Sequence, residues 1–291
     1  MTSPLPDGSR DRRIEDPTNL LIVHPLSRAL LRPAIGAGMS ANAVSVAGLG
    51  IGVSAAWAFA QWQDWRLAVL GLLLATGWLI LDGLDGMVAR ATGTASPLGR
   101  FLDGLCDHGV FTLIYVAIAT EVGTAQGWTL AVAAGAAHAV QSSLYEGERA
   151  RFHRRIKGLP APSERIASLN PAVRLYDVVA TGLDRVARRF DLLFAGPDAA
   201  ALALAYGERA TPPMRLLSLL SANMRVMALF LACIAGDPAL FWWFEIAPLT
   251  LVALAGIIWH RRVETRLLRV SIHSAAPRQA GSASPILSKG S

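Results

Sequence analysis

The sequence predicts an all-α, polytopic integral membrane protein with six transmembrane helices. Over 291 residues, 53% are hydrophobic and only 16% are charged, which is too apolar for an ordinary soluble domain. Several apolar segments approach or exceed the roughly 20 residues that a helix needs to cross a bilayer. The connections between them alternate between basic and nearly uncharged. The predicted spans are residues 43–60, 66–80, 105–122, 128–144, 216–235 and 240–259.

The charges of the connections predict the orientation of the spans. The connections QWQDWR, EVGTAQG and AGDPA carry one basic residue between them, whereas ARATGTASPLGR, GERARFHRRIK and HRRVETRLLR are strongly basic. Basic loops stay on the cytoplasmic side. We therefore expect a multi-pass protein of the cell inner membrane with both termini in the cytoplasm. The net charge of +6 fits these loops and anionic headgroups better than it fits nucleic acid.

The N-terminal region divides into a tail and a helix. Residues 1–18 are polar, so we expect a disordered cytoplasmic tail without the apolar core of a cleaved signal. Residues 19–38 contain apolar side chains at helical spacing together with Arg28 and Arg32. This pattern predicts an amphipathic helix in the headgroup plane, with an ordinary linker as the alternative.

The rest of the chain is predicted to form four further regions. We expect spans one to four in residues 39–146, a cytoplasmic insertion at 147–212, spans five and six at 213–262, and a cytoplasmic tail at 263–291. Within the insertion, apolar residues from Leu175 to Phe190 predict a basic amphipathic helix that rests on the membrane or on the insertion's second helix. Cys106 and Cys233 both lie in apolar spans, so no disulfide framework is expected.

Four aspartates interrupt the apolar sequence between the second and third spans. Asp82 and Asp85 lie one helical turn apart, and Asp103 and Asp107 lie four residues apart. Two helices that meet at these faces would bring four carboxylates together, and they would repel one another unless cations lay between them. Oxygen ligands suit magnesium or manganese, and two ions are the economical solution. The segment therefore predicts a two-metal site.

The residues around the aspartates favour a phosphate ligand. Gly86 and Ala89 make a smooth strip beside Asp82, and Arg90 can form paired hydrogen bonds with a phosphate. Ser96-Pro97 has the pattern of a helix start, with serine as cap and proline at the first position. Gly99 again leaves one helix face bare. Close helix packing is the other explanation for the small residues.

These residues together resemble the signature of a known family. The pattern Asp82-x-x-Asp85-Gly86-x-x-Ala89-Arg90, eight residues, and Gly99-x-x-x-Asp103-x-x-x-Asp107 resembles that of the CDP-alcohol phosphotransferase (CDP-alcohol phosphatidyltransferase) family. The resemblance extends over about residues 19–260. It implies a metal-dependent enzyme of phospholipid biosynthesis that moves a substituted phosphate group from a CDP-linked donor to an alcohol and releases CMP. It also implies a homodimer.

The resemblance assigns a role to each residue of the signature. Two divalent cations, magnesium or manganese, would be held by Asp82, Asp85, Asp103 and Asp107, and Asp107 would also be the catalytic base. The cytidine diphosphate pocket would be lined by Gly86, Ala89, Arg90, Ser96 and Gly99. His108 is an alternative base, although on a helix it points about 100° away from Asp107.

The substrates are less closely defined. CDP-diacylglycerol is the expected donor, because a site at the cytoplasmic end leaves the acyl chains in the bilayer; a soluble CDP-alcohol with a lipid acceptor is the alternative. Acceptor contacts are sought among Tyr145, Glu146, Glu148, Arg149, Arg151, Asn223 and Arg225. The three arginines slightly favour a phosphorylated polyol over a neutral or amino alcohol. The chain departs from the family in Ser40-Ala41-Asn42, where many relatives have Thr-Pro-Asn.

Two other classes of membrane protein use carboxylates in helical bundles. An aspartate-rich prenyltransferase usually carries its acidic motifs in two widely separated parts of the chain, whereas here all four aspartates fall between residues 82 and 107. A cation transporter binds its ion near the middle of the bilayer. Because this cluster lies at a cytoplasmic end beside a basic loop, the transferase is the preferred interpretation.

Overall fold

The computed structural model describes residues 11–94, 97–160, 187–196 and 198–275, with the backbone alone for 97–107 and 272–275. Within these ranges the chain forms helices and turns and no strand, which confirms the predicted all-α class. The elements are η1 (Asn19–Val23), α1 (His24–Gly36), α2 (Ala41–Ala60), α3 (Trp65–Thr92), α4 (Pro97–Val122), α5 (Ala125–Ile156), η2 (Leu193–Ala195), α7 (Ala199–Leu217), η3 (Ser218–Leu220), α8 (Ala222–Ile234), α9 (Ala239–Ile246) and α10 (Pro248–Ala275).

The chain forms two compact units. The first contains Met1–Glu146 and Arg215–Leu254, and the second contains Gly147–Met214 and Ala255–Ser291. Helices α5 and α10 each contribute to both units.

Three helices in the described ranges are long and apolar enough to cross a membrane: Ala41–Ala60, Trp65–Thr92 and Ala239–Ser271. The pair Ala199–Leu220 and Ala222–Ile234, bent by 44°, would make a fourth span if it counts as one. His108–Val122, the part of α4 with described side chains, is apolar but shorter. These helices indicate an integral membrane protein, and the number six stays a prediction.

The predicted span at 216–235 is interrupted, whereas 240–259 lies within Ala239–Ser271, one of the helices long enough to cross a membrane. Residues 216–235 include the turn η3, after which the Ser221 hydroxyl caps α8 by accepting from the Met224 N–H at 3.5 Å. Residues 240–259 change from α9 to α10 at Pro248. Proline has no N–H for a helical hydrogen bond, so it suits the first turn of α10.

The core of the first unit is built from aromatic and aliphatic side chains of α2, α3, α4, α8 and α9. Small residues allow the helices to approach closely. A Cβ atom added to Gly52 of α2 would lie 2.4 Å from a methyl group of Val110 in α4. The ring centroids of Trp78 in α3 and Phe111 in α4 lie 5.6 Å apart. These contacts fix the register between the helices that carry the aspartates.

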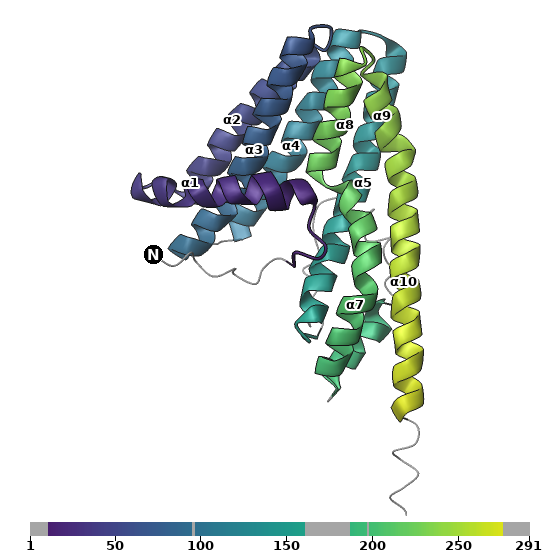
Figure 1. Cartoon of the computed structure of the whole chain (residues 1–291). Helices are drawn as coiled ribbons and strands as arrows, with labels where there is room; N and C mark the ends of the chain where they lie inside the picture. Colours follow the sequence, from purple (N-terminus) through teal and green to yellow (C-terminus); the bar gives the residue numbers. More distant parts are fainter. Residues whose placement is uncertain (1–10, 95–96, 161–186, 197, 276–291) are drawn as a thin grey trace, which may run out of the picture. The chain divides into compact units, whose positions relative to one another are not determined.

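Helix α1 crosses the ends of α2 and α3 near the aspartate segment (Figure 1). Its Ser27 is buried and its hydroxyl lies 2.7 Å from the carbonyl oxygen of Ile80 in α3. Ala34 packs in a small cluster with Val44, Leu84 and Val88. The structure thus contains a helix where the sequence predicts one, and its position in the headgroup plane stays a prediction.

The predicted N-terminal tail needs correction for residues 11–18. Ile14 is 1% exposed, and the carboxylate of Asp16 accepts hydrogen bonds from the Thr18 N–H at 2.7 Å and the Ser221 hydroxyl at 3.2 Å. Arg215 also donates to the carbonyl oxygen of Arg13 at 2.7 Å. These contacts pack residues 11–18 against the start of α8 and the end of α7. The polar composition of the segment gives no sign of them, because they depend on one buried isoleucine and one carboxylate.

The predicted C-terminal tail also begins too early. Helix α10 continues through Ala275, with Val263 and Leu267 buried. In the insertion, residues 187–192 are helical, while the rest of the predicted amphipathic helix from Leu175 lies outside the described residues, as do 276–291.

Candidate active site

The first pair of aspartates lies near the C-terminal end of α3. Asp85 is 6% exposed and Asp82 is half-buried. The Ser45 hydroxyl, from α2, donates a hydrogen bond of 2.5 Å to Oδ2 of Asp85. A buried carboxylate oriented by a hydroxyl of a neighbouring helix is typical of a ligand that a second layer of residues holds in place.

The helix register brings the second pair to the same place. Trp78 and Phe111 are in contact, and α3 and α4 are neighbours joined by a short connection, so they run antiparallel. Asp82 follows Trp78 by four residues, and Asp107 precedes Phe111 by four. Each therefore lies one turn from the contact, toward the same end of the two helices. The side chain of Asp107 lies outside the described residues.

The remaining two aspartates continue these faces by one more turn. Asp85 lies seven residues beyond Trp78 in α3, and Asp103 lies eight residues before Phe111 in α4. Both spacings return to the same helix face. The backbone therefore places all four aspartates of the signature along two facing stretches, although the side chain of Asp103 is not described.

The glycine and the arginine of the signature lie against each other. A Cβ atom added to Gly86 would lie 3.2 Å from Nη1 of Arg90, so the guanidinium covers the bare backbone of the glycine. Ala89 is half-buried on the same helix. Helix α3 then ends at Gly93, whose φ of +67° is the left-handed conformation that favours glycine at a helix C-cap.

The second half of the signature is described by its backbone alone. Helix α4 begins at Pro97, as the sequence predicts, and Gly99 lies in its first turn. Ser96, predicted as the cap of this helix and as a ligand contact, lies outside the described residues. Its role and that of Gly99 stay predictions.

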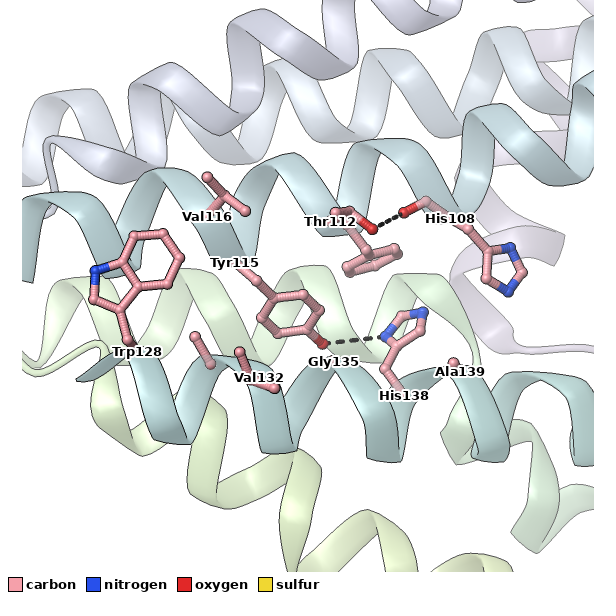
Figure 2. A pocket seen from close by; sticks show the side chains of 11 residues that line it. His108, Thr112, Tyr115, Val116, Trp128, Val132, Gly135, His138 and Ala139 are labelled. Atoms are coloured by element: carbon pink, nitrogen blue, oxygen red, sulfur yellow. Dashed lines mark hydrogen bonds between the residues drawn. The ribbon is translucent and has the colours of Figure 1, made fainter. Parts of the chain in front are cut away.

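The alternative base His108 faces the gap between α4 and α5. Its ring centroid lies 6.4 Å from that of His138 in α5, and both rings line a pocket between these helices (Figure 2). A direction toward α5 agrees with the helical offset that separates His108 from Asp107. Asp107 therefore stays the predicted base.

Arg225 is not available to an acceptor. It is 0% exposed, and its guanidinium is surrounded by acceptors of the first unit. Nε donates to the carbonyl oxygen of Leu220 at 3.2 Å and Nη2 donates to Oε1 of Gln141 at 3.0 Å. Nη1 lies 3.0 Å from Nδ1 of His138 and also forms an ion pair with Glu245. A buried arginine with this set of partners serves the packing of α5, α8 and α9.

Two other acceptor candidates also have structural partners. The side-chain amide of Asn223 donates to Oδ1 of Asn19 at 2.8 Å and to Oδ1 of Asp16 at 3.3 Å. Arg151 forms an ion pair of 2.6 Å with Glu148. The preference for a phosphorylated acceptor was based on these arginines, and the structure therefore weakens it.

The second unit contains a buried cluster that the sequence does not suggest. Glu148, His260 and Glu264 each offer a ligand atom, and these atoms lie within 4.8 Å of one another. The separation alone would permit a metal ion. None of the three belongs to the signature.

Arginines already occupy this cluster. Arg261 contacts both glutamates, at 2.6 Å for Glu264, and Arg155 forms a second ion pair with Glu264. Nδ1 of His260 lies 2.7 Å from Oε2 of Glu148. A divalent cation here would lie beside two guanidinium groups and be repelled by both. The cluster is therefore better explained as a buried ion-pair network.

Burial alone would raise the pKa of the Glu148 carboxyl. The hydrogen bond from His260 and the charges of Arg261 and Arg151 outweigh burial, so the pKa of Glu148 lies well below its usual range. This carboxylate is therefore ionised at neutral pH, as an ion-pair network requires.

Sequence reasoning missed Ser45 because nothing in the signature points to it. It comes from a different helix, 40 residues before Asp85. Its position in α2 could only be linked to the aspartates once the packing of α2 on α3 was known.

Comparison with known proteins agrees with the signature. Residues 39–162 match the family model described as CDP-alcohol phosphatidyltransferase. An archaetidylinositol phosphate synthase of Aeropyrum pernix is 48% identical over 56 residues, which are 19% of this chain and 28% of that protein. Cholinephosphotransferase 1 of Rattus norvegicus is 38% identical over 71 residues, and that of Homo sapiens is 31% identical over 102 residues.

These similarities are partial. The matched segments are 24% and 31% of this chain for the rat and human proteins, and 17% and 24% of the two relatives. The chain thus spans less than a third of the length of the curated relatives that it matches. The family model, however, covers the signature and the helices that present it, so the resemblance read from the sequence is confirmed as a match to this family over residues 39–162.

Proposed function

We propose that the protein is a metal-dependent membrane transferase that moves a phosphatidyl group from CDP-diacylglycerol to an alcohol and releases CMP. The observation that carries this proposal is the register of α3 and α4, which aligns Asp82 and Asp85 with Asp103 and Asp107 through the contact of Trp78 with Phe111. The membrane-spanning helices support a lipid-linked substrate.

The residues present fit a pair of divalent cations. The four signature positions offer carboxylate oxygens, which are the ligands that magnesium and manganese prefer. The hydrogen bond from Ser45 to Asp85 supplies the outer support that metal ligands usually have. Asp82, Asp85, Asp103 and Asp107 would hold the ions, which neutralise the diphosphate and the charge on the leaving CMP.

The remaining steps belong to the protein's own side chains. Arg90, lying over Gly86, is positioned to bind a phosphate of the donor. Asp107 takes the proton from the hydroxyl group of the acceptor alcohol. As it does so, the hydroxyl oxygen of the acceptor forms a bond to phosphorus, and the bond between phosphorus and the CMP oxygen breaks. Catalysis then depends mainly on positioning and on stabilising charge.

A soluble CDP-alcohol with a lipid acceptor is the second candidate. The similarity to proteins named cholinephosphotransferase favours this candidate. The relative named archaetidylinositol phosphate synthase makes a different product, as its name states. Because the two names differ, similarity alone does not choose the acceptor. We further propose that the site and both termini face the cytoplasm of the inner membrane, and that the protein is a homodimer.

The purified protein in detergent is expected to release CMP only when magnesium or manganese is present. One assay offers CDP-diacylglycerol with a panel of glycerol phosphate, inositol phosphate, free inositol and serine, and the other offers CDP-choline with diacylglycerol. Asp82→Asn and Asp103→Asn should each lower turnover by at least about a thousandfold, because each removes a negative ligand from the metal site.

Asp64→Asn is the matched control for these variants. Asp64 is the N-cap of α3, where asparagine caps equally well, and it lies outside the signature. This variant should keep wild-type turnover. Undiminished CMP release in chelator, or from the Asp82→Asn variant, would contradict the proposed function.

A further inference from the structure

A pocket between α4 and α5 is not accounted for by the metal and nucleotide chemistry. It has a volume of about 270 Å³ and is lined mainly by apolar side chains of the first unit (Figure 2). This exceeds the roughly 150 Å³ of an engineered cavity that takes up benzene. On α5 its lining runs from Trp128 to Ala139, a length of about 16 Å along the helix.

The shape of the pocket suits one extended chain. Ala131, Gly135 and Ala139 recur every four residues on α5 and form a bare strip, while Phe111 and Tyr115 of α4 form an aromatic wall. A Cβ atom added to Gly135 would lie 3.7 Å from the Tyr115 ring, in ordinary contact, so larger side chains there would enter the pocket. The length of about 16 Å is close to half of the roughly 30 Å hydrocarbon core of a bilayer.

The two ends of the pocket differ in polarity. One end is lined by His108, which directly follows the predicted base Asp107, and by His138. The other end, at Trp128 and Val132, is apolar and open, with Val132 67% exposed. The pocket therefore has one polar end, next in sequence to the predicted base, and one apolar end, as a site for an amphiphile would.

The polar end of the pocket carries a hydrogen-bond donor, the ring of His138, which neighbouring side chains hold in place through its other nitrogen. Nδ1 of His138 lies 3.0 Å from Nη1 of Arg225, 3.2 Å from the Tyr115 hydroxyl and 3.6 Å from Oε1 of Glu245, so the guanidinium is its nearest partner and the carboxylate lies beyond hydrogen-bond distance. Because a guanidinium only donates, Nδ1 is the acceptor and the proton of the neutral ring is on Nε2. Figure 2 shows the ring of His138 between Tyr115 and His108. The Nε2–H group is thus available at the polar end of the pocket.

We propose that this pocket binds one hydrocarbon chain of the lipid substrate, with the Nε2–H group of His138 donating to an oxygen next to that chain. The inference rests on the proposed function for the identity of the substrate. The chain belongs either to the CDP-linked donor or to a lipid acceptor, since both present the same hydrocarbon and a nearby oxygen.

Filling the pocket tests the proposal. Gly135→Leu places a side chain between Ala131 and Ala139, whereas Ala136→Leu adds the same group at the next, exposed position, which does not line the pocket. The kcat/KM of both variants is measured relative to wild type with short-chain and long-chain substrates. One arm varies the chains of CDP-diacylglycerol and the other varies those of diacylglycerol with CDP-choline. Each arm reports on one source of the chain.

Each buried methylene group contributes about fourfold to binding. Gly135→Leu should therefore lower kcat/KM for the long-chain substrate by at least about tenfold in one arm, and leave the short-chain substrate within about twofold. Ala136→Leu should match wild type at every chain length. Equal behaviour of the two leucine variants in both arms would overturn the proposal.

A binding readout separates this test from a failure of the proposed function. A Val132→Cys variant is labelled with a maleimide in detergent. The wild-type chain is labelled in parallel, to measure the background reaction of Cys106 and Cys233. Long-chain lipid should slow labelling at residue 132 by at least about fivefold, and short-chain lipid should not, even if no CMP is released. The proposal would be overturned if residue 132 became protected from labelling as the protein concentration rises and if Gly135→Leu lowered the particle mass measured by light scattering. Those two results together would make the pocket an interface between two copies of the chain.

Discussion

At the scale of single residues, Ser45 is a contact that links one of the proposed metal ligands to a neighbouring helix. Its hydroxyl donates to Asp85 at 2.5 Å, and Asp85 is buried, so few other donors can replace it. Outer partners of metal ligands typically change metal affinity by 10- to 100-fold when they are removed. Ser45 is thus a positioning residue, which acts on the site through Asp85.

We expect Ser45→Ala to raise the magnesium concentration for half-maximal activity by about tenfold, with a smaller effect on turnover at saturating magnesium. The measurement is CMP release over a magnesium titration. Ser54→Ala is the control, because Ser54 is exposed on the same helix and donates only to the carbonyl oxygen of Gly50. An unchanged titration for Ser45→Ala would show that Asp85 needs no support from α2.

The helix faces that the aspartates share could be predicted from the sequence because their spacing is local. Three and four residues along a helix always return to one face, whatever the helix packs against. The arginines could not be assigned in this way. Arg225 stands where topology places basic residues, but Glu245, Gln141 and His138 come from other helices and bury its guanidinium. A charge in a sequence does not show which partner folding will bring to it.

At the scale of helices, α1 meets α3 beside the active site at one close contact. A Cβ atom added to Gly83 would lie 2.9 Å from Oγ of Ser27, and the next neighbours would be 3.7 Å away. Gly83 lies between Asp82 and Asp85, so a displacement of α1 or α3 at this point would reach two of the proposed metal ligands. The glycine is needed for the approach of the two helices rather than for an unusual backbone conformation.

Gly83→Ala is expected to destabilise the protein by about 1 to 3 kcal/mol through overpacking. In a Ser27→Ala background the nearest atom moves to about 3.7 Å, so the same change should be neutral or stabilising, since alanine favours a helix by about 1 kcal/mol over glycine. Thermal unfolding of the single and double variants in detergent measures the difference. The coupling should lie between about 0.5 and 3 kcal/mol.

Gly77→Ala is the control for this cycle, because Gly77 lies on the same helix α3 and its added Cβ atom would make an ordinary contact of 3.6 Å with Ile51 of α2. It should be neutral or stabilising with serine or alanine at position 27. If the effects of Gly83→Ala and Ser27→Ala are additive, α1 can move away from α3 at little energetic cost. This contact would then not determine how closely the two helices approach.

The helices themselves were predicted well where apolar runs are continuous. The predicted spans at 43–60 and 66–80 agree with α2 and α3, because length and hydrophobicity decide such segments. Residues 216–235 are equally apolar, yet the turn before Ser221 interrupts them. Hydropathy averaged over a span does not reveal a single helix cap, so this break is visible only in the backbone.

At the scale of the whole molecule, the sequence did not show that the region after Gly147 and the second half of α10 form one unit. The second unit joins Glu148 and Arg155 of α5 with His260, Arg261 and Glu264 of α10. More than a hundred residues separate the two sets, and each has the appearance of a charged cytoplasmic segment. Only folding shows that they neutralise one another in a buried network.

This network predicts how the stability of the second unit depends on pH. The pKa of Glu148 lies below its usual value of 4.5, because its ion pairs outweigh the effect of burial. A group whose pKa is lowered by folding contributes stability that is fully present above its unfolded pKa and is lost as the pH falls through its folded pKa. We expect Glu148→Gln to lower the free energy of unfolding by about 3 kcal/mol at pH 7, since Arg261 and Arg151 lose a buried charge partner.

The difference between wild type and Glu148→Gln should stay constant from neutral pH down to about 5 and shrink below 4.5, because only the wild type loses a charge there. Thermal unfolding in detergent across this range measures it. Glu208→Gln is the control, since Glu208 is exposed on α7 of the same unit and should change stability by less than about 0.5 kcal/mol at any pH. A difference that grows on acidification would mean that Glu148 is protonated in the folded protein, and the cluster with His260 and Glu264 would then have to be held together by something other than ion pairs.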